Sequence, residues 1–279
     1  MTQSAVIQEP GSSMNFQNIL YAVDQGVAVI RFNRPKALNA MTMDLMGELG
    51  QAFDAAAADK AVRVIVLTGE GRAFSTGADL AATGDKPPLD LQGRLDLGYV
   101  LDRYYNPLIL KMRELPKPII SAVNGIAAGA GANLALMADL TVAARSTYFL
   151  QAFVNVGLIP DAGGTWILPR AIGPQRAMGL ALNGDKLPAQ TAKEWGLIWD
   201  VVDDAELMPA VMAMAQRFAA GPGVAIERIK QAIHAAAQND LGKQLDLESD
   251  LQRDCGRSQD FMEGAMAFVQ KRKPNFKGR

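Results

Sequence analysis

Two glycine-rich segments of the chain contain residue types suited to binding a negatively charged oxygen atom. The first comprises residues 71–80 and the second comprises residues 124–135. Gly125, Gly129 and Gly131 allow the second segment to turn sharply and to approach a ligand closely, because glycine has no side chain. An Ala- and Leu-rich stretch follows and predicts a helix. The first amide groups of that helix have no acceptor within it and attract negative charge.

Both segments follow predicted strands, so their turns are expected to be of the same kind. The strands are residues 63–68 and 117–123, which are rich in β-branched and other apolar side chains. One backbone N–H from each strand-to-helix turn would form an oxyanion hole, a pair of donors that stabilises a negative oxygen. Glycine turns that bind nothing are also common in α/β proteins, and the spacing alone leaves this alternative open. Neither segment has the pattern of a phosphate-binding loop or of a dinucleotide-binding fingerprint.

The composition of the chain excludes several classes of protein. Its 279 residues include 28 Lys and Arg against 29 Asp and Glu, and this balance gives no basic excess for nucleic acid. No apolar run approaches the ~20 residues of a membrane span. Cys255 is the only cysteine, which excludes an internal disulfide and favours a reducing compartment. We therefore expect a cytoplasmic protein with neither a membrane nor a nucleic-acid partner, in which the polar residues 1–14 form a flexible extension.

The scarcity of histidine and cysteine restricts the chemistry that the chain can perform. His234 is the only histidine, and it lies in a helical stretch far in sequence from both glycine segments, so a packing role is favoured over catalysis. A Ser-His-Asp triad, a Cys-His pair or a His-rich zinc site is hard to assemble from this set. Acid–base chemistry is therefore expected from carboxylates, Lys or Tyr, and no metal site is expected.

The pattern along the chain predicts a mixed core followed by helices alone. Strands are predicted at residues 16–21, 27–32, 63–68, 118–123, 139–144 and 199–202. Helices are predicted at residues 42–58, 91–115, 174–182 and 188–195. Thr42 is expected to be the N-cap of the first, and the second is expected to be interrupted at 106–107. Residues 149–169 are expected to be irregular. After Asp203, helices are predicted at 205–220, 222–238, 243–255 and 258–271. This division predicts an α/β core at residues 15–204 and a C-terminal helical region at residues 205–279.

Four segments, in this order and spacing, resemble the crotonase superfamily of enoyl-CoA hydratases and isomerases over nearly the whole chain. They are residues 33–40, 74–80, 118–132 and 157–165. Further segments are similar to the group of 1,2-epoxyphenylacetyl-CoA isomerases of phenylacetate breakdown, and they lie at 104–108, 127–132, 158–166, 168–170, 176–182, 194–196 and 198–204. The segment Phe74-Ser75-Thr76 departs from that group, which commonly has a cysteine there.

The resemblance implies a spiral of β-β-α turns, with C-terminal helices that build a homotrimer or a dimer of trimers. Apolar residues at helical spacing, Leu207, Val211, Met214 and Phe218, are expected to contribute to that assembly. It also implies an acyl-CoA thioester substrate whose carbonyl oxygen accepts from the N–H groups of Ala78 and Ala130. The substrate-binding residues carried over by motif position are Ala37, Leu38, Ala40, Thr76, Asp79, Leu80, Gly129 and Asn133. Coenzyme A is then part of the substrate, and no separate cofactor is expected.

The acid–base residues of this superfamily differ between its activities. Hydratases orient water with two glutamates, whose positions correspond to Asn133 and Phe153 here, so the resemblance does not imply a standard hydratase mechanism. Asp161 is the remaining candidate, since isomerases of aromatic-ring thioesters carry an aspartate at this position. Its apolar neighbours Ile159, Pro160 and Ala162 are expected to raise its pKa by desolvation. The local sequence alone also fits Asp161 as the N-cap of a following helix.

Three functions follow from the resemblance and remain open at this point. The first is isomerisation of 2-(1,2-epoxy-1,2-dihydrophenyl)acetyl-CoA to oxepin-CoA, with Asp161 as the sole acid–base residue. The second is an enoyl-CoA hydratase-like activity or a Δ3,Δ2-enoyl-CoA isomerase activity of fatty-acid oxidation. The third is a catalytically silent subunit that binds acyl-CoA without turning it over.

Overall fold

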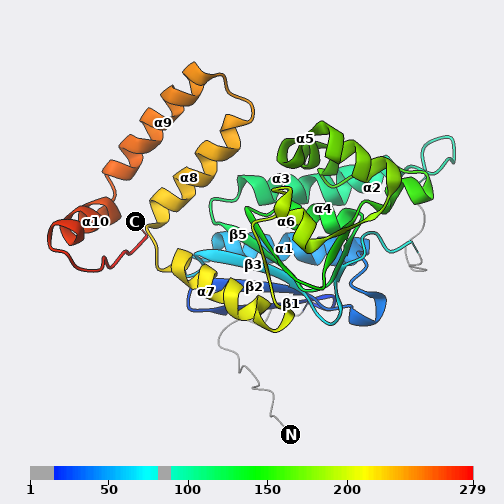
Figure 1. Ribbon diagram of the computed structural model, residues 1–279, viewed down its shortest axis with the longest axis horizontal. Coiled ribbons are helices and arrows are strands. Elements are labelled where there is room, and N and C mark those ends of the chain that lie inside the picture. The colour runs from blue at the N-terminus through cyan, green and yellow to red at the C-terminus, as the bar shows by residue number, and fades with distance from the viewer. Residues whose placement is uncertain (1–15, 81–88, 279) are drawn as a thin grey trace, which may run out of the picture.

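A six-stranded sheet forms the centre of the molecule (Figure 1). The computed structural model describes residues 16–80 and 89–278, so the extension predicted at residues 1–14 lies outside the described residues. The strands are β1 (Ile19–Asp24), β2 (Val27–Phe32), β3 (Val64–Gly69), β5 (Ile119–Val123), β7 (Leu140–Ala144) and β10 (Asp200–Val202). They lie in the order β1-β2-β3-β5-β7-β10, and every pair except the β1–β2 hairpin is parallel. All six predicted strands are therefore present.

A second sheet of short strands lies beside the first. It contains β4 (Ala73–Ser75), β6 (Ile126–Ala128), β8 (Tyr148–Leu150) and β9 (Lys186–Pro188), in the order β4-β6-β8-β9. Three times along the chain a long strand is followed by a short one: β3 by β4, β5 by β6, and β7 by β8. This repeated alternation between two sheets, with helices returning the chain, confirms the predicted spiral.

The helices of the core agree with the predictions at their long, periodic parts. Helix α1 (Met43–Ala58) begins after Thr42, whose side chain accepts from the Leu45 N–H at 3.2 Å, as expected of an N-cap. The chain between β4 and β5 contains α2 (Leu97–Val100), a π-helical turn over Leu101–Tyr105 and α3 (Asn106–Glu114). The interruption predicted at 106–107 takes the form of this π-helical turn, which ends directly before Asn106; the backbone stays helical, and Pro107 lies in the first turn of α3, where a missing N–H costs little.

Three further core helices complete the spiral. They are α4 (Ala130–Leu136), α5 (Gly164–Asn183) and α6 (Ala189–Glu194). Helix α5 is kinked at Gly173, which has φ 78° and ψ 160°, so Pro174 begins its second half as predicted. Its first half occupies residues that were expected to be irregular. Pro169 within this half is the signal that argued against a helix there.

Helix α7 (Leu207–Ala219) covers the face of the six-stranded sheet that is turned away from the second sheet. Leu207, Val211 and Ala215 are buried and pack with Val66 and Ile120 of the central strands. Both faces of the parallel strands are thus covered, which explains why β3 is buried along its whole length. Met214 and Phe218 pack partly against the same cluster. The four apolar residues expected to serve assembly therefore cover the sheet of their own chain.

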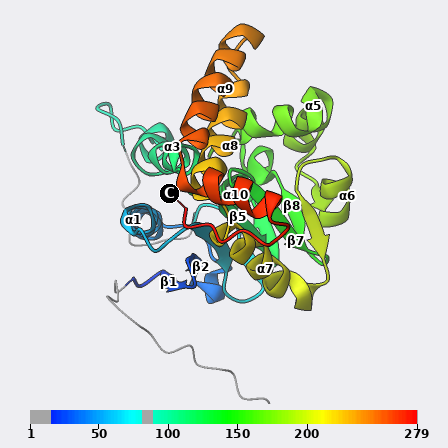
Figure 2. The ribbon, with the colours of Figure 1, turned by 90° about the vertical axis from the view of Figure 1, so that its left-hand side faces the viewer.

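The last three helices form an extended arm. They are α8 (Gly223–Ala236), α9 (Leu241–Gly256) and α10 (Gln259–Val269), and only helices follow β10 among the described residues. Figures 1 and 2 show α9 standing away from the two sheets. Several large apolar side chains of the arm are exposed, namely Ile229, Ile233, Leu241, Leu245, Phe261, Met262, Met266, Phe268 and Val269. No helix in the described ranges is both long and apolar enough to span a membrane.

Candidate active site

The two glycine-rich segments meet in the folded chain. Gly77 has φ +88°, and a Cβ at this position would lie 2.9 Å from the Ala128 carbonyl oxygen and 3.3 Å from the Ala130 nitrogen. Contacts this short leave no room for a side chain, so the backbone after β4 lies directly against the backbone before α4. The predicted juxtaposition of the two segments is therefore present.

The Ala130 N–H lies at the start of α4. Gly129 is the N-cap, with φ 52° and ψ −132°, and no side chain caps this end of the helix. The first N–H groups of a helix have no acceptor within it. Within the described part of the chain, the N–H of Ala130 has no protein acceptor, which leaves it available to a ligand oxygen.

The Ala78 N–H is positioned by a contact with a distant segment. The helix predicted to follow the first glycine segment falls on residues 81–88, which lie outside the described residues, and the next described helix is α2 at Leu97. Ala78 forms an isolated parallel bridge with Met41. The Met41 N–H donates to the Gly77 carbonyl at 2.8 Å, and the Asp79 N–H donates to the Met41 carbonyl at 3.0 Å. These bonds use the neighbours of Ala78 and leave its own N–H pointing to the opposite side, because backbone N–H groups alternate along an extended chain.

The segments expected to line coenzyme A lie next to each other. The Leu38 carbonyl accepts from the Thr76 N–H at 3.2 Å, so residues 37–40 run beside residues 76–80. Arg34 Nη1 donates to Asp79 Oδ2 at 2.9 Å and also to the Ala40 carbonyl, and this ion pair joins the two segments. The Asp79 side chain thus helps to hold residues 37–40 beside residues 76–80. Leu80, in contrast, is 77% exposed.

Asp161 lies in a tight turn before α5. One carboxylate oxygen, Oδ1, is buried and has no hydrogen-bond partner within the described residues. Burial raises the pKa of Asp161 to about 6, although a hydrogen bond from its own backbone N–H acts in the opposite direction. The N-cap alternative is wrong, because Gly163 is the N-cap of α5 and no side chain caps that end. The desolvated carboxyl expected from the sequence is therefore present.

Asn133 connects Asp161 to the first turn of α4. Its Nδ2 donates to the Asp161 carbonyl at 2.8 Å, and its side chain is completely buried. Because Asn133 lies three residues after Ala130, roughly one helical turn, a single short helix carries the candidate oxyanion donor and the contact to Asp161. The Phe153 side chain is buried, and its ring lies 3.8 Å from the position of a Cβ at Gly129.

Two further residues beside this site carried no distinct signal in the sequence. Gln151 is 2% exposed, and its Nε2 donates to Asn133 Oδ1 at 2.9 Å. Burial raises the pKa of the Tyr105 hydroxyl, and the negative charge of Asp161 raises it further, which places Tyr105 within electrostatic reach of the carboxylate. The contacts that define both residues join segments far apart in the sequence, and no local spacing encodes them.

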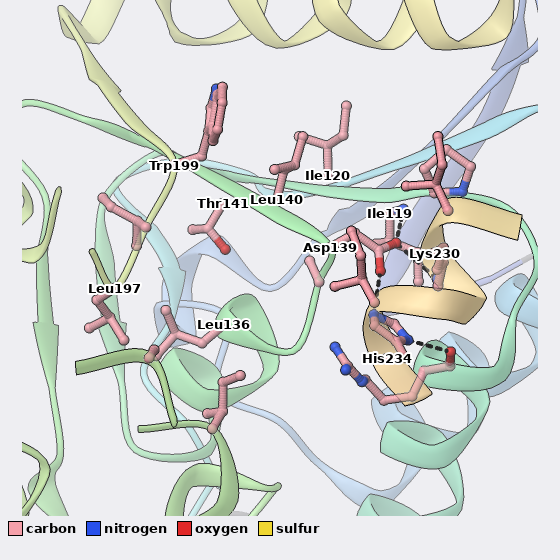
Figure 3. A pocket seen from close by; sticks show the side chains of 18 of the residues that line it. Ile119, Ile120, Leu136, Asp139, Leu140, Thr141, Leu197, Trp199, Lys230 and His234 are labelled. Atoms are coloured by element: carbon pink, nitrogen blue, oxygen red, sulfur yellow. Dashed lines mark hydrogen bonds and ion pairs between the residues drawn. The ribbon is translucent and has the colours of Figure 1, made fainter. Parts of the chain in front are cut away.

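A separate cavity of about 570 Å³ lies between α8 and the core (Figure 3). Two basic side chains that line it contact the same carboxylate. Lys230 Nζ lies 2.9 Å from Asp139 Oδ2, and His234 Nε2 lies 3.2 Å from Asp139 Oδ1. Burial acts to raise the pKa of Asp139, but the His234 hydrogen bond and the Lys230 charge outweigh it and lower the pKa. His234 Nδ1 also lies 3.2 Å from the Arg113 carbonyl oxygen. These contacts agree with the packing role expected for His234, since they anchor α8 to the core.

Comparisons with known proteins agree with this geometry. The family model described as enoyl-CoA hydratase/isomerase matches residues 22–279. The 1,2-epoxyphenylacetyl-CoA isomerase of Escherichia coli (strain K12) is 47% identical over 94% of this chain and 98% of its own length. A probable enoyl-CoA hydratase of Rhodobacter capsulatus is 46% identical over 95% of this chain and all of its own. The crystal structure of an enoyl-CoA hydratase from Bacillus anthracis superimposes with a TM-score of 0.85, at 33% identity, over 94% of this chain and 100% of the other.

The spiral of two sheets, with the two glycine segments in contact, defines a crotonase-type protein. The chain belongs to the enoyl-CoA hydratase/isomerase family. The resemblance inferred from the sequence and the expected fold class are confirmed. In the described ranges, no group of three or more His, Cys, Asp and Glu residues is arranged to hold a metal ion.

Proposed function

We propose that this protein is an acyl-CoA isomerase that converts 2-(1,2-epoxy-1,2-dihydrophenyl)acetyl-CoA to oxepin-CoA. The observation that carries the proposal is the carboxyl group of Asp161, whose Oδ1 is buried without a partner and whose backbone is bonded to the helix that begins with the Ala130 N–H. The 47% identity to a 1,2-epoxyphenylacetyl-CoA isomerase supports the choice of substrate.

The proposed mechanism divides the work between backbone donors and one carboxylate. The thioester carbonyl oxygen accepts from the N–H groups of Ala78 and Ala130, which stabilise the negative charge of an enolate. Each such donor contributes about 3–4 kcal/mol to the transition state in comparable sites. Asp161, as a carboxylate, takes a proton from one carbon and returns it to another, or assists the opening of the ring epoxide to the seven-membered oxepin. No metal and no separate cofactor takes part, so we expect unchanged turnover in the presence of a chelator.

The substitution Asp161→Asn tests the assignment most directly. The amide keeps the size of the side chain but cannot transfer a proton, so we expect kcat to fall by about 10²–10⁴-fold, the usual contribution of general acid–base catalysis. The affinity for a non-reacting CoA thioester, measured by calorimetry, should stay close to that of the wild type. A fall of only a few-fold in kcat would contradict the role of Asp161.

The same residues support a second isomerase activity more than they support hydration. A Δ3,Δ2-enoyl-CoA isomerase needs the same proton transfer on an aliphatic chain. A hydratase needs carboxylates to orient water, whereas Asn133 cannot act as a base and Phe153 is a buried aromatic residue beside Gly129. We therefore expect turnover of the ring epoxide and of a 3-enoyl-CoA, and very slow hydration of crotonyl-CoA. Hydration at a rate typical of a dedicated hydratase would contradict the assignment.

A catalytically silent acyl-CoA-binding subunit is the remaining alternative, and solvent exchange distinguishes it. An isomerase incubated with a substrate analogue in deuterated water exchanges α- or γ-protons, which mass spectrometry detects. A silent subunit binds the thioester without exchange. The raised pKa of Asp161 supports the active enzyme, because a carboxyl group that serves only structure gains nothing from being buried without a partner.

We further propose a homotrimer, or a dimer of trimers, working in the cytoplasm. The exposed apolar side chains of the arm, including Phe268 at 86% and Val269 at 80%, support burial against other copies of the chain. The single cysteine supports a reducing compartment.

A further inference from the structure

The backbone around Asp161 is held in a strained turn. The Asp161 carbonyl accepts from the Gly164 N–H at 2.8 Å, which closes a four-residue turn, and the two central residues, Ala162 and Gly163, have φ values of 47° and 81°. Positive φ at both central positions is typical of a type I′ turn, in which glycine and asparagine are favoured. Alanine at such an angle is uncommon and persists only where the surroundings impose it.

The Asn133 side chain contacts this turn directly. Its Nδ2 donates to the same Asp161 carbonyl at 2.8 Å. A Cβ at Gly164 would lie 2.2 Å from Asn133 Nδ2, so the amide lies directly against the backbone of the turn. Any change in the direction of the Asn133 amide therefore moves the backbone that carries the Asp161 carboxyl group.

Gln151 fixes the direction of the Asn133 amide. Its Nε2 donates to Asn133 Oδ1 at 2.9 Å, which leaves the Nδ2 end of Asn133 facing Asp161. If the amide of Gln151 were reversed, two amide oxygens would face each other. Gln151 Oε1 is buried without a partner within the described residues. Buried polar atoms without partners destabilise a fold, and they are expected where a structure serves function at the expense of stability.

We propose that Asn133 and Gln151 are positioning residues that act in series on Asp161. Gln151 orients Asn133, and Asn133 holds the strained turn so that the Asp161 carboxyl stays buried near the first turn of α4. This inference rests on the proposed function, in which Asp161 transfers the proton. It also gives Asn133 a role that does not need contact with the substrate, in keeping with its complete burial.

The test compares Asn133→Ala and Gln151→Met with the wild type, using kcat, KM and the pH dependence of kcat. Misplacement of a reacting group by a fraction of an ångström to 1 Å lowers rates by up to ~10²-fold, so we expect kcat to fall about 10- to 100-fold while KM changes little. The midpoint of the pH profile should move to lower pH, because a loosened turn admits water to the Asp161 carboxyl. The double variant should be little worse than either single variant, since the two residues act in series.

Thr141→Val is the matched control. Thr141 of β7 is buried, and its hydroxyl donates at 2.9 Å to the Ala135 carbonyl of α4, the helix that also carries Asn133. This variant should lose stability in thermal unfolding but keep the kcat and the pH midpoint of the wild type. If it loses kcat in parallel with the other two, the effect of Asn133 and Gln151 is purely structural and the proposal is wrong.

The result for Asp161→Asn separates this proposal from the proposed function. If Asp161→Asn is inactive while Gln151→Met keeps the wild-type kcat and pH midpoint, the positioning proposal fails and the proposed function stands. If Asp161→Asn is active, the proposed function fails. Should Asn133→Ala not fold, Gln151→Met decides alone, because Gln151 does not touch the turn itself.

Discussion

At the scale of single residues, the proposed chemistry depends on the Asp161 carboxyl group, one oxygen of which is buried without a partner among the described residues. The type of residue was recognisable in the sequence, and the pKa of Asp161 is raised by burial as expected. Ile159, one of the neighbours expected to cause this, is 77% exposed, so the burial comes from other parts of the fold. The partners of Asp161 were not recognisable. Asn133 contacts Asp161 directly, Gln151 contacts Asn133, and the Tyr105 hydroxyl lies within electrostatic reach of the carboxylate. These contacts and the positive φ of Ala162 depend on tertiary structure, so no local sequence pattern predicts them.

The pH dependence of activity follows from the pKa of Asp161. A general base must be ionised, and the pKa of this carboxyl is raised to about 6. We expect kcat/KM to rise tenfold per pH unit below about pH 6 and to level off above it. Initial rates between pH 4.5 and 8 give the profile. A plateau extending down to pH 4.5 would show that the carboxyl is solvated in the working enzyme.

The pH dependence of stability should have the opposite sign. The pKa of Asp161 is raised from 3.8 to about 6 on folding, so between these values the folded chain binds more protons than the unfolded chain. Stability from this group therefore decreases as the pH rises through that window. Asp161→Asn removes the ionisation, and we expect its Tm to exceed that of the wild type at pH 7.5 but to match it near pH 3.8. Equal Tm differences at both values would contradict the burial of the charge.

At the scale of elements, the long strands and helices were predictable because their periodicity extends over several turns or pairs. The strands β4, β6, β8 and β9 were not, since three residues are too few to show alternation. The orientation of the Ala78 N–H could not be predicted from the sequence either. Its position depends on a bridge to Met41, which lies before α1, and only the folded chain brings these residues together.

The contact between the two glycine segments predicts a sharp difference between two glycine substitutions. Gly77→Ala places a Cβ 2.9 Å from the Ala128 carbonyl at a φ of +88°, so the two oxyanion donors must separate. We expect kcat to fall about 10²–10³-fold, as when one oxyanion donor is lost. Gly47→Ala in α1 is the control, because nothing lies within 4 Å of its Cβ position. It should keep full activity and gain roughly 0.5–1 kcal/mol in the free energy of unfolding. Equal activities of the two variants would contradict the geometry of the site.

At the scale of the whole molecule, the division into a mixed core and a terminal set of helices could be predicted from composition, but the role of each helix could not. Helix α7 has the same amphipathic pattern as the helices of the arm, and only its packing on the sheet shows that it belongs to the core. The apolar residues of α7 were expected to form contacts between subunits, but they pack on the sheet. We now expect those contacts from the apolar residues that are exposed on α9 and α10.

Deletion of the residues from 243 onward tests that expectation. The deletion removes most of α9 and all of α10, and we expect it to abolish both the oligomer and the activity. Light scattering at micromolar concentration measures the first effect, and turnover of the ring epoxide measures the second. A full-length chain that is monomeric would contradict the proposed trimer, and an active truncated monomer would show that these helices serve stability only.

The attachment of α8 to the core also has a consequence for the order in which the chain folds. Asp139 precedes β7, whereas Lys230 and His234 come after the last strand, so these bonds join parts of the chain that are distant in sequence. Contacts between distant segments form late, since the intervening chain must first be ordered. Asp139 itself accepts from the Ile119 N–H at 2.8 Å and is therefore fixed when β5 is in place. The core should thus acquire its structure first, and α8 should dock onto a finished surface, giving a slow final phase that Lys230→Met prolongs and that leaves earlier phases unchanged.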